Sequence, residues 1–510
     1  MGRRTGLSPR KTRPTKPGAG QGDRRRTVLA VVGGCLLLAL SSPEASPPRP
    51  STSSEPLQLY ERTWIRDGRL TSEAETVLKL MAAAERHGLR SELYLTPALE
   101  SRLSEMAARP NQRAALKAEE ALAEAFFRFA SDVRSPDAMV QVVDPAASLK
   151  PLTPSETLSA VRREGPEHVV RLAPEYERLA DTLEQWRRRW RNLPRLQLRE
   201  GPDVRPGATD KRMPALRTRL GRAPGGASAM LDPVLASRLE DFQRWHGLDQ
   251  TGILNGPTVR ALNRDPEEYE RLILTNMARL RALPITEPRR RVQVNIASAV
   301  LTAKENGETV LTMRVVVGRK DTPTPMLAGA VRYLVLSPYW NLPQDLVQSR
   351  VAPVALIRGD AALKAGGFEA LSDWSPKARR LRADEVDWKA VAAGERRVRV
   401  RQLPGDRNMM GAVKFMLPND LGIYLHDTPS RGLFSAPQRA FSAGCVRLED
   451  AQAFGRWIAG RNLADLADGS AEQRVDLVEP VPVYLLYLTA APRPGGGLIL
   501  GPDPYGWDGL

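Results

Sequence analysis

The sequence predicts a multidomain α+β protein in which a helical N-terminal region and a small three-helix module precede a β-rich domain with a helical insertion. Three observations support this fold class. The chain has 510 residues, more than one domain of ordinary size holds. Its first half places apolar residues at helical spacing, whereas β-branched runs separated by Gly, Pro and Asp begin near Arg289. A Gly- and Pro-rich stretch at residues 201–226 separates the first helices from the rest.

The composition excludes several classes of protein. The hydrophobic fraction of 42% is ordinary for a globular protein. Two Cys cannot make a disulfide-stapled scaffold or a cysteine-rich zinc domain, and four His make a histidine-based metal site hard to assemble. We therefore expect no metal and no cofactor. A single apolar stretch excludes a polytopic membrane protein.

The net charge of +16 is unevenly distributed along the chain. Residues 1–26 contain nine Lys or Arg and one Asp, so half of the net charge lies there. The mostly apolar residues 28–40 follow, and a basic run before a short apolar core is typical of an export signal. Because no Ala-x-Ala cleavage site follows, an uncleaved signal anchor is the alternative. We expect residues 1–41 to be this export signal or anchor, and residues 42–56 to be a Pro/Ser-rich linker.

Residues 57–200 are expected to form a helical scaffold domain. Ser72 and Glu75 have the spacing of a capping box at a helix start. A later helix places large apolar residues on one stripe: Tyr176, Leu179, Leu183, Trp186 and Trp190. Arginines lie between these aromatic residues, as on some nucleic-acid surfaces, but the aromatic residues follow the helix period. We therefore expect a buried stripe with a solvated face behind it, and no nucleic-acid partner. Residues 201–226 are expected to be a linker.

Residues 227–264 have the pattern of a compact helical module. Proline stands at a first-turn position in Gly256-Pro257-Thr258, which predicts a helix start. Two strings define the module: Phe242-Gln243-x-Trp245-His246-Gly247-Leu248-x-x-Thr251-Gly252 and Gly256-Pro257-Thr258-Val259-x-Ala261-Leu262-Asn263. They resemble the small three-helix peptidoglycan-binding module of cell-wall enzymes, which implies binding of glycan or stem peptide. Residues 265–288 are expected to be a connecting helix.

The β-rich domain is expected over residues 289–490, with an insertion at 344–396 and a C-terminal tail at 491–510. Its strand-like runs are Val292 to Val300, Val310 to Val317, Val331 to Leu336, Val398 to Leu403, Val413 to Leu417, Gly422 to His426 and Val481 to Leu488. The insertion has a helical, charged texture and lies between strands. It is therefore expected to be a lid or cap.

The residues with catalytic chemistry lie in one segment. Cys445 is the only cysteine beyond the export segment, so it has no disulfide partner and is a candidate nucleophile. A thiolate needs a base and hydrogen-bond donors for the oxyanion it creates. His426 closes a strand-like run, and Gly444 permits a tight turn that offers the N–H groups of Gly444 and Cys445 to an oxyanion. Arg447 would suit a substrate carboxylate or hold the turn.

These residues belong to a longer pattern, composed of His426-x-Thr428-Pro429 and Ser442-Ala443-Gly444-Cys445-x-Arg447. Both strings are similar to the signature of L,D-transpeptidases, His-x-Thr-Pro with Ser-His-Gly-Cys-x-Arg. Further matches are Gly411-x-x-Lys414-Phe415-x-x-Pro418-Asn419 and Val316-Val317-Gly318-x-x-x-x-Pro323-x-Pro325. With the helical region, the module and the tail, the chain resembles the large multidomain Gram-negative subgroup. Ala443 stands where many members have histidine, so His426 is the only local base.

The resemblance implies a cysteine acyltransferase of peptidoglycan located in the periplasm. Cys445, activated by His426, would attack the carbonyl between the third residue of a tetrapeptide stem and its terminal D-Ala, and D-Ala would leave. A diaminopimelate side-chain amine of another stem would resolve the thioester and give a 3→3 cross-link. Cell-wall synthesis proteins are possible partners, and membrane contact is expected only through the N-terminal anchor.

The resemblance also assigns secondary roles. The backbone carbonyl of Asp427 would orient His426, while the Asp427 side chain could instead pair with Arg447 or Arg439. Tyr424 either lines the donor pocket or belongs to the core. Ser442 and Arg447 are the other candidates for substrate binding.

Three alternatives stay open at this point. Water as acceptor would make the protein an L,D-carboxypeptidase, and a lipoprotein amine would make it a lipoprotein-attaching transpeptidase. The chain could also be a catalytically silent wall-binding protein, in which Cys445 is a buried thiol and His426 a satisfied core histidine.

Overall fold

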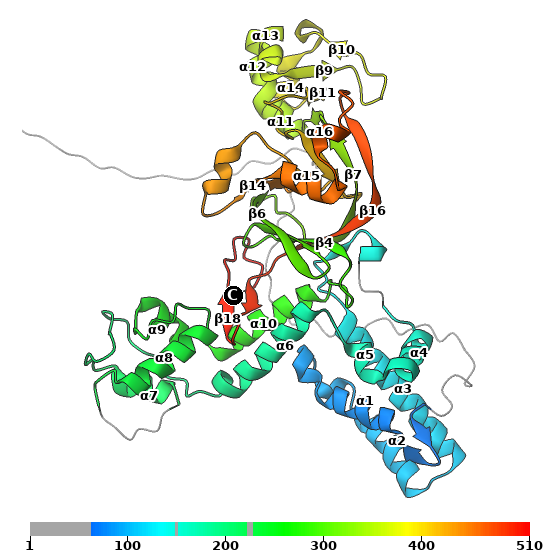
Figure 1. The fold of residues 1–510 in the computed structure, drawn as a ribbon, viewed down its shortest axis with the longest axis vertical. Coiled ribbons are helices and arrows are strands. Elements are labelled where there is room, and N and C mark those ends of the chain that lie inside the picture. Colours follow the sequence, from blue (N-terminus) through cyan, green and yellow to red (C-terminus); the bar gives the residue numbers. More distant parts are fainter. Residues whose placement is uncertain (1–62, 148–150, 222–227, 510) are drawn as a thin grey trace, which may run out of the picture. The chain divides into compact units, whose positions relative to one another are not determined.

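The computed structural model describes residues 63–147, 151–221 and 228–509, and Figure 1 shows its ribbon. The chain divides into the units Met1–Pro56 and Leu57–Leu510, so the expected export segment and the linker after it lie outside the described residues. The fold class is confirmed: helices come first, then the small module, then a β-rich domain. Within the described ranges, no helix is both long and apolar enough to cross a membrane.

The N-terminal region consists of short and medium helices: α1 (Ser72–Ala82), α2 (Pro97–Ala108), α3 (Gln112–Arg134), α4 (Pro154–Glu164), α5 (Pro166–Val170) and α6 (Pro174–Trp186). The expected capping box at Ser72 and Glu75 is wrong by one residue, because the N-cap of α1 is Thr71, whose side chain accepts a helical N–H. A reciprocal capping box does open α4, where Thr153 and Glu156 bond to each other's backbone N–H.

The aromatic stripe predicted along α6 is buried. Its members are at most 1% exposed: Tyr176, Leu179, Leu183, Trp186 and Trp190. Trp190 follows α6 in a π-helical turn, Arg187–Arg191. The arginines between the aromatic residues form ion pairs, for example Arg187 Nε with Glu270 Oε1 at 2.8 Å. Arg188, Arg189 and Arg191 are exposed and form the predicted solvated face, whereas Arg187 is half-buried against Glu270.

The small module begins earlier than expected. It contains α7 (Met213–Arg219), α8 (Pro233–Trp245) and α9 (Gly256–Asn263), so α7 lies inside the predicted linker at 201–226. Met213 and Leu216 of α7 are fully buried. The Gly and Pro residues of this stretch mark turns within a folded unit. The connecting helix α10 (Pro266–Leu280) follows as expected.

The β-rich domain is organised around one large sheet. Its strands are β4 (Arg290–Asn295), β5 (Val300–Glu305), β6 (Glu308–Gly318), β7 (Leu327–Leu336), β12 (Val413–Met416), β13 (Leu425–His426), β14 (Ala440–Ser442), β15 (Val446–Leu448) and β16 (Gln473–Leu486), with β3 (Gln141–Val142) at one edge. The expected strand from Val292 to Val300 is instead two strands, because the chain turns at Ala299, where φ is 52°.

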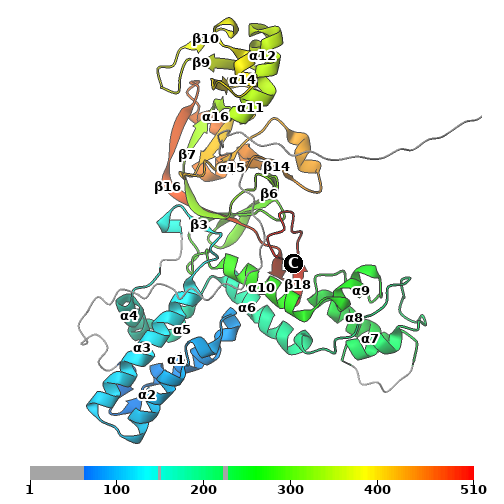
Figure 2. The same ribbon diagram turned by 180° about the vertical axis from the view of Figure 1, so that it is seen from behind.

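This sheet closes on itself. Strand β12 pairs with both β13 and β7, and the path through β15, β6, β5, β4 and β16 returns to β7. The long strands β7 and β16 run antiparallel and adjacent, as the view from behind shows (Figure 2). Closure leaves an apolar interior and places the ends of β13 and β15 next to each other.

The insertion is larger and less helical than expected. Besides α12 (Ala352–Arg358), α13 (Asp360–Gly366) and α14 (Trp388–Ala392), it contains a sheet of β8 (Trp340–Asn341), β9 (Phe368–Leu371), β10 (Arg380–Leu381) and β11 (Arg399–Gln402). Its own core runs from Leu342 to Val400, beyond both expected bounds of 344–396. The run from Val398 to Leu403, expected in the main domain, therefore belongs to the insertion.

Candidate active site

Strand register gathers the polar side chains of the site on one sheet face. In β13, His426 pairs with Lys414 of β12 and with Arg447 of β15. One residue earlier in β13, Leu425 pairs with Phe415 and with Val446, and these three side chains are fully buried in the core. Because successive side chains of a strand point to opposite faces, His426, Lys414 and Arg447 share the other face. Tyr424 and Cys445, two residues before His426 and Arg447, come to that face as well.

Cys445 is a half-buried free thiol at the start of β15. Its Sγ lies 3.6 Å from the carbonyl oxygen of Gly422 and donates to it. Burial raises the pKa of the thiol, while hydrogen bonds from Tyr424 and the charges of Arg447 and Lys414 act in the opposite direction. The resting group is therefore a thiol, with cations placed to stabilise the thiolate once it forms.

His426 is 2% exposed and held by its own strand end. Its Nδ1 lies 2.5 Å from the backbone carbonyl oxygen of Asp427. Since a carbonyl only accepts, Nδ1 carries the proton and Nε2 keeps its lone pair as the basic nitrogen. Burial, and next the charge of Arg447, lowers the pKa of His426 to about 3, so the imidazole is neutral near pH 7.

Among the described residues, no direct hydrogen bond joins the Cys445 thiol to His426. In the register of the two parallel strands Cys445 lies level with Tyr424, so it is diagonal to His426, two residues out of register and on the same face. Hydrogen bonds between catalytic groups often form only once substrate is bound. The arrangement therefore places a nucleophile and a base on one face without a resting ion pair.

Asp427 acts on His426 through its backbone, and its carboxylate has other partners. Oδ1 accepts from Arg431 Nη2 at 2.6 Å, and Oδ2 accepts from the Ala412 N–H at 2.9 Å. Neither Arg447 nor Arg439 is its partner. Gly411 makes room for this carboxylate: its φ is +60°, and a Cβ there would lie 2.3 Å from Asp427 Oδ2.

The turn before Cys445 is held from inside by Ser442. The Ser442 hydroxyl donates to the Cys445 carbonyl oxygen at 2.6 Å and accepts the Gly444 N–H at 3.1 Å. Ser442 is 2% exposed, so it shapes the turn, and a substrate cannot reach its hydroxyl without opening that turn. The Gly444 N–H is occupied as well. In the described part of the chain the Cys445 N–H has no acceptor, so it is the available donor for an oxyanion.

Two cations border the thiol. Arg447 has a buried Nε without a hydrogen-bond partner, and no carboxylate pairs with it among the described residues. Lys414 lies with Nζ 5.8 Å from the Tyr424 ring centre, and its nearest carboxylate oxygen, on Glu472, is 3.9 Å away. Burial lowers the pKa of both cations. These two groups are poised to attract an anionic substrate.

Sequence reasoning gave Lys414 no role of its own. The available signal was its place in the Gly411-x-x-Lys414-Phe415 string, where strand alternation sets the lysine opposite the buried Phe415. Tyr424, for which both a pocket and a core role were expected, is half-buried on the catalytic face, with its ring centre 5.6 Å from that of His426. Among described residues, no group of His, Cys, Asp and Glu is arranged to hold a metal ion.

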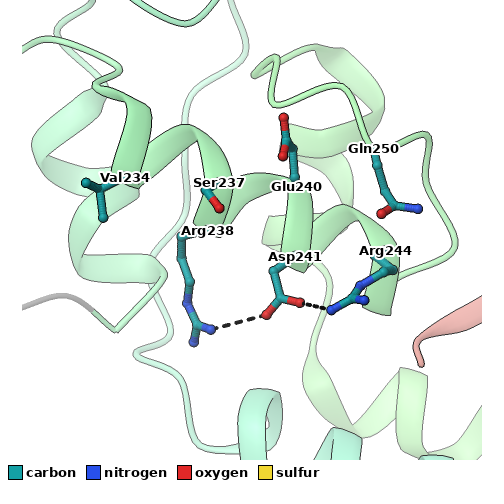
Figure 3. A pocket seen from close by; sticks show the side chains of 7 residues that line it. All are labelled: Val234, Ser237, Arg238, Glu240, Asp241, Arg244 and Gln250. Atoms are coloured by element: carbon teal, nitrogen blue, oxygen red, sulfur yellow. Dashed lines mark hydrogen bonds and ion pairs between the residues drawn. The ribbon is translucent and has the colours of Figure 1, made fainter. Parts of the chain in front are cut away.

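A second polar feature lies on the small module, where helix α8 borders an open hollow of about 510 Å³. Figure 3 shows Arg238 and Arg244 pointing toward Asp241 from the same helix, at 3.4 and 2.5 Å. Arg189 also reaches Asp241, at 3.6 Å. Asp241 is therefore surrounded by three arginines, and Glu240 is the second carboxylate that lines the hollow. The hollow is lined by Val234, Ser237, Arg238, Glu240, Asp241, Arg244 and Gln250.

Three stretches of the chain match known protein families. Residues 289–483 match the YkuD family, "L,D-transpeptidase catalytic domain", and residues 217–262 match "Putative peptidoglycan binding domain". Residues 57–183 match a "Scaffold domain". Both family resemblances stated from the sequence are therefore confirmed. The match to the peptidoglycan-binding family begins at residue 217, within α7, which agrees with the earlier start of the module in the structure.

A curated relative is the "Putative L,D-transpeptidase" of Haemophilus influenzae, 32% identical over 244 residues. The match covers 46% of this chain and 47% of the relative, so the chain spans about half the length of the curated relative it matches. Solved structures give weaker likenesses. An L,D-transpeptidase from Mycobacterium smegmatis is 13% identical over 39% of this chain and 58% of its own, with a TM-score of 0.19. One from Xylanimonas cellulosilytica is 16% identical over 56% and 99%, with a TM-score of 0.15. Likenesses this weak carry no argument about this chain.

Proposed function

We propose that this chain, which carries an L,D-transpeptidase catalytic domain and a peptidoglycan-binding domain, cross-links peptidoglycan through a thioester on Cys445. One observation carries the proposal: a single sheet face holds a free thiol, a neutral imidazole, a lysine whose carboxylate partner lies 3.9 Å away, and an arginine that no carboxylate pairs with among the described residues. That set provides a nucleophile, a base and positive charge for an anionic acyl donor.

The acylation step follows from the protonation states. As the thiol approaches the carbonyl between the third stem residue and the terminal D-Ala, its proton passes to Nε2 of His426. Sγ bonds to the carbonyl carbon, and the carbonyl oxygen becomes an oxyanion near the Cys445 N–H. The imidazolium returns its proton to the amine of D-Ala, the C–N bond breaks and D-Ala leaves. The product is a thioester between the stem peptide and Cys445.

Deacylation uses the same groups in reverse. A diaminopimelate side-chain amine of a second stem attacks the thioester carbon and His426 takes a proton from that amine. The C–S bond then breaks, and the imidazolium passes the proton to the leaving sulfur, which restores the Cys445 thiol. The new amide is a 3→3 cross-link. Arg447 and Lys414 suit this chemistry because stem peptides carry carboxylates, and charged partners in a half-buried site bind more strongly than neutral ones.

We infer that the protein acts outside the inner membrane, in the periplasm, where peptidoglycan lies. The basic and apolar pattern of residues 1–41 supports export, with an uncleaved anchor as the alternative. The small module would hold the enzyme to the wall. Its hollow beside α8, which presents Arg238 and Arg244, is the surface we propose for contact with anionic wall groups.

The first test is acylation by a carbapenem, measured by intact mass. We expect one adduct on the wild-type protein, mapped to Cys445 by peptide analysis, and none on Cys445→Ala. Arg474→Gln, which changes an exposed ion pair with Asp476, is the matched control and should be acylated like the wild type. Absence of an adduct, or an adduct that survives Cys445→Ala, contradicts the proposal and favours the silent wall-binding protein.

The second test identifies the acceptor. Sacculi rich in tetrapeptide stems are incubated with the wild type or with Cys445→Ala, and the muropeptides are separated and weighed. Cross-linking predicts 3→3 dimers together with free D-Ala. Tripeptides without dimers would mean that water is the acceptor, and stems joined to a lipoprotein peptide added to the mixture would mean attachment.

A further inference from the structure

A chain of buried hydrogen bonds links the catalytic turn to the C-terminal tail. The first link is Thr324, which is fully buried after β6. Its Oγ1 lies 2.8 Å from the Gly318 N–H and 2.7 Å from the Gly444 carbonyl oxygen. A hydroxyl has one proton, and the Gly318 N–H can only donate. The Thr324 proton therefore goes to the Gly444 carbonyl.

That carbonyl fixes the direction of a catalytic donor. The carbonyl of Gly444 and the N–H of Cys445 belong to one planar trans peptide unit, so they point in opposite directions. Holding the carbonyl on Thr324 aims the Cys445 N–H the other way. Gly444 has φ +118°, a region in which its backbone would otherwise be free to choose among several orientations.

Ser442 completes the constraint from the other side of the same turn. It accepts the Gly444 N–H and donates to the Cys445 carbonyl oxygen. Three of the four polar backbone groups of Gly444 and Cys445 are thus bonded within the protein. The fourth, the Cys445 N–H, has no acceptor in the described ranges, and its direction is set by the other three.

The second link is Tyr505, 3% exposed, in the tail. Its hydroxyl donates to the Gly318 carbonyl oxygen at 2.6 Å and accepts the Thr324 N–H at 3.3 Å. One phenol therefore bridges both sides of the turn that presents Thr324. The turn packs so closely on Gly318 that no side chain fits there, because a Cβ would lie 2.3 Å from the Thr322 carbonyl oxygen.

The tail is itself fastened to the core. Tyr505 donates its N–H to the Tyr487 hydroxyl at 2.9 Å, and the two rings stack with centroids 5.3 Å apart. Arg279 of α10, fully buried, donates to Asp508 Oδ1 at 2.7 Å and to the Trp507 carbonyl oxygen at 2.9 Å. A buried ion pair contributes little net stability because desolvation offsets it, but its geometry is strict. The phenol of Tyr505 is therefore held in one place.

We propose that Thr324 and Tyr505 are positioning residues of the acylation step, which orient the Cys445 N–H toward the oxyanion through the Gly444 carbonyl. This inference rests on the proposed function, because it presumes that Cys445 is acylated. Neither residue touches the substrate. Their effect passes through one peptide plane, and the tail acts as a fixed part of the active site although it lies about sixty residues beyond Cys445 in the sequence.

The test compares two reactions of the same thiol in the full chain. Acylation by a carbapenem passes through a tetrahedral oxyanion, whereas alkylation by iodoacetamide does not. Loss of one oxyanion donor costs about 100- to 1000-fold in related acyl transfers, and a misaimed donor should cost part of that. We expect Thr324→Val to slow saturated acylation about tenfold, Tyr505→Phe about threefold, and neither to change alkylation by more than about twofold.

Matched variants separate positioning from folding. Thr324→Ser keeps the hydroxyl and should restore acylation to the wild-type rate. Tyr484→Phe removes an equally buried phenol hydrogen bond, to the Ala147 carbonyl oxygen, and Thr182→Val removes a buried threonine hydroxyl in α6. Both controls should acylate normally. Melting temperatures of all variants report their folding.

The outcomes distinguish the two proposals. If the wild type is alkylated but never acylated at Cys445, the proposed function fails, and the positioning role with it. If the wild type is acylated and Thr324→Val matches it, only the positioning role is overturned. Equal losses of acylation and alkylation in Thr324→Val, or a failure of Thr324→Ser to restore the rate, also overturn it, because they indicate a general disturbance of the turn.

Discussion

The small module and the catalytic sheet each bury one histidine, and burial lowers the pKa of both to about 3. In the module, His246 has both ring nitrogens engaged. Nδ1 bonds to the Phe242 carbonyl oxygen at 2.7 Å, and Nε2 accepts from the Trp186 indole at 3.4 Å. The ring stacks on Phe242 with centroids 3.8 Å apart. This histidine is an aromatic core residue with satisfied polar atoms.

In the catalytic sheet, His426 also bonds through Nδ1 to a backbone carbonyl, but its neighbours differ. Lys414 and Arg447 are its partners on the two neighbouring strands, and Cys445 lies diagonally on the same face, two residues out of register. His87 is a third buried histidine whose pKa is lowered to about 3, beside the Tyr176 hydroxyl. A low pKa therefore reports burial. Function is indicated by the reactive and charged groups that share the histidine's surroundings.

The largest expected effect tests this contrast directly. His426→Gln should lower the rate of carbapenem acylation at least about 100-fold, because general base catalysis is lost, with little change in melting temperature. His246→Gln should acylate within about twofold of the wild type, yet melt lower, because it leaves the Trp186 indole without its acceptor at a cost of about 1 to 3 kcal/mol. Acylation rates and thermal unfolding of the two variants decide the matter.

Equal acylation rates in His426→Gln and His246→Gln would contradict the different roles assigned to the two histidines. Acylation that survives His426→Gln would mean that the thiol is activated without this base. A large loss of acylation in stably folded His246→Gln would mean that the module participates in the chemistry.

A smaller effect is expected at the cation beside the thiol. Arg447→Gln should weaken binding of a carboxylate-bearing acyl donor about tenfold, while the saturated acylation rate changes less, because a charge-assisted contact is lost. Arg290→Gln is the control, since Arg290 is also a partly buried arginine of this domain with an unsatisfied Nε. Concentration dependence of acylation separates the two constants. Equal losses in both variants would argue against a substrate contact at Arg447.

Local patterns predicted much of this molecule. Cys445 and His426 are predicted as nucleophile and base because the chain has few cysteines and histidines and both residues lie in short strings. The buried stripe along α6 followed from helical spacing alone. Such signals depend on neighbours within about ten residues, which is the range over which periodicity and turn chemistry operate.

Features set by distant partners were not predictable in the same way. Ser442 reads as a polar residue beside the nucleophile, and only the folded turn shows its hydroxyl bonded inward. The strand β11 has ordinary strand chemistry, and pairing with β9 assigns it to the insertion. Tyr505 and Thr324 lie 181 residues apart in the chain. Their hydrogen bond follows from closure of the whole domain, which no local pattern encodes.

The two regions should also be separable in wall binding. Arg244→Ala, in the hollow of the module, should lower the fraction of protein that pellets with purified sacculi about threefold, an effect that weakens as salt rises. Its carbapenem acylation should match the wild type. Arg260→Ala, an exposed arginine on α9 of the same module, is the control and should pellet normally. Loss of acylation in Arg244→Ala, or equal pelleting of the two variants, would contradict this separation.

The smallest effect concerns pH, where stability and chemistry should diverge. The pKa values of His87, His246 and His426 are lowered from an ordinary 6.5 to about 3 in the folded chain. Between those limits the unfolded chain binds protons that the folded chain does not, so the free energy of unfolding falls as pH drops below about 6.5. Melting temperature should decline by several degrees from about pH 7 to about pH 5, and His246→Gln should show a shallower decline.

Acylation of folded protein should stay level over that range, because His426 remains neutral. An acylation rate that falls with a midpoint near pH 6.5 would show that His426 titrates like an exposed histidine. It would contradict the claim that burial lowers the pKa of His426 as it lowers that of His246.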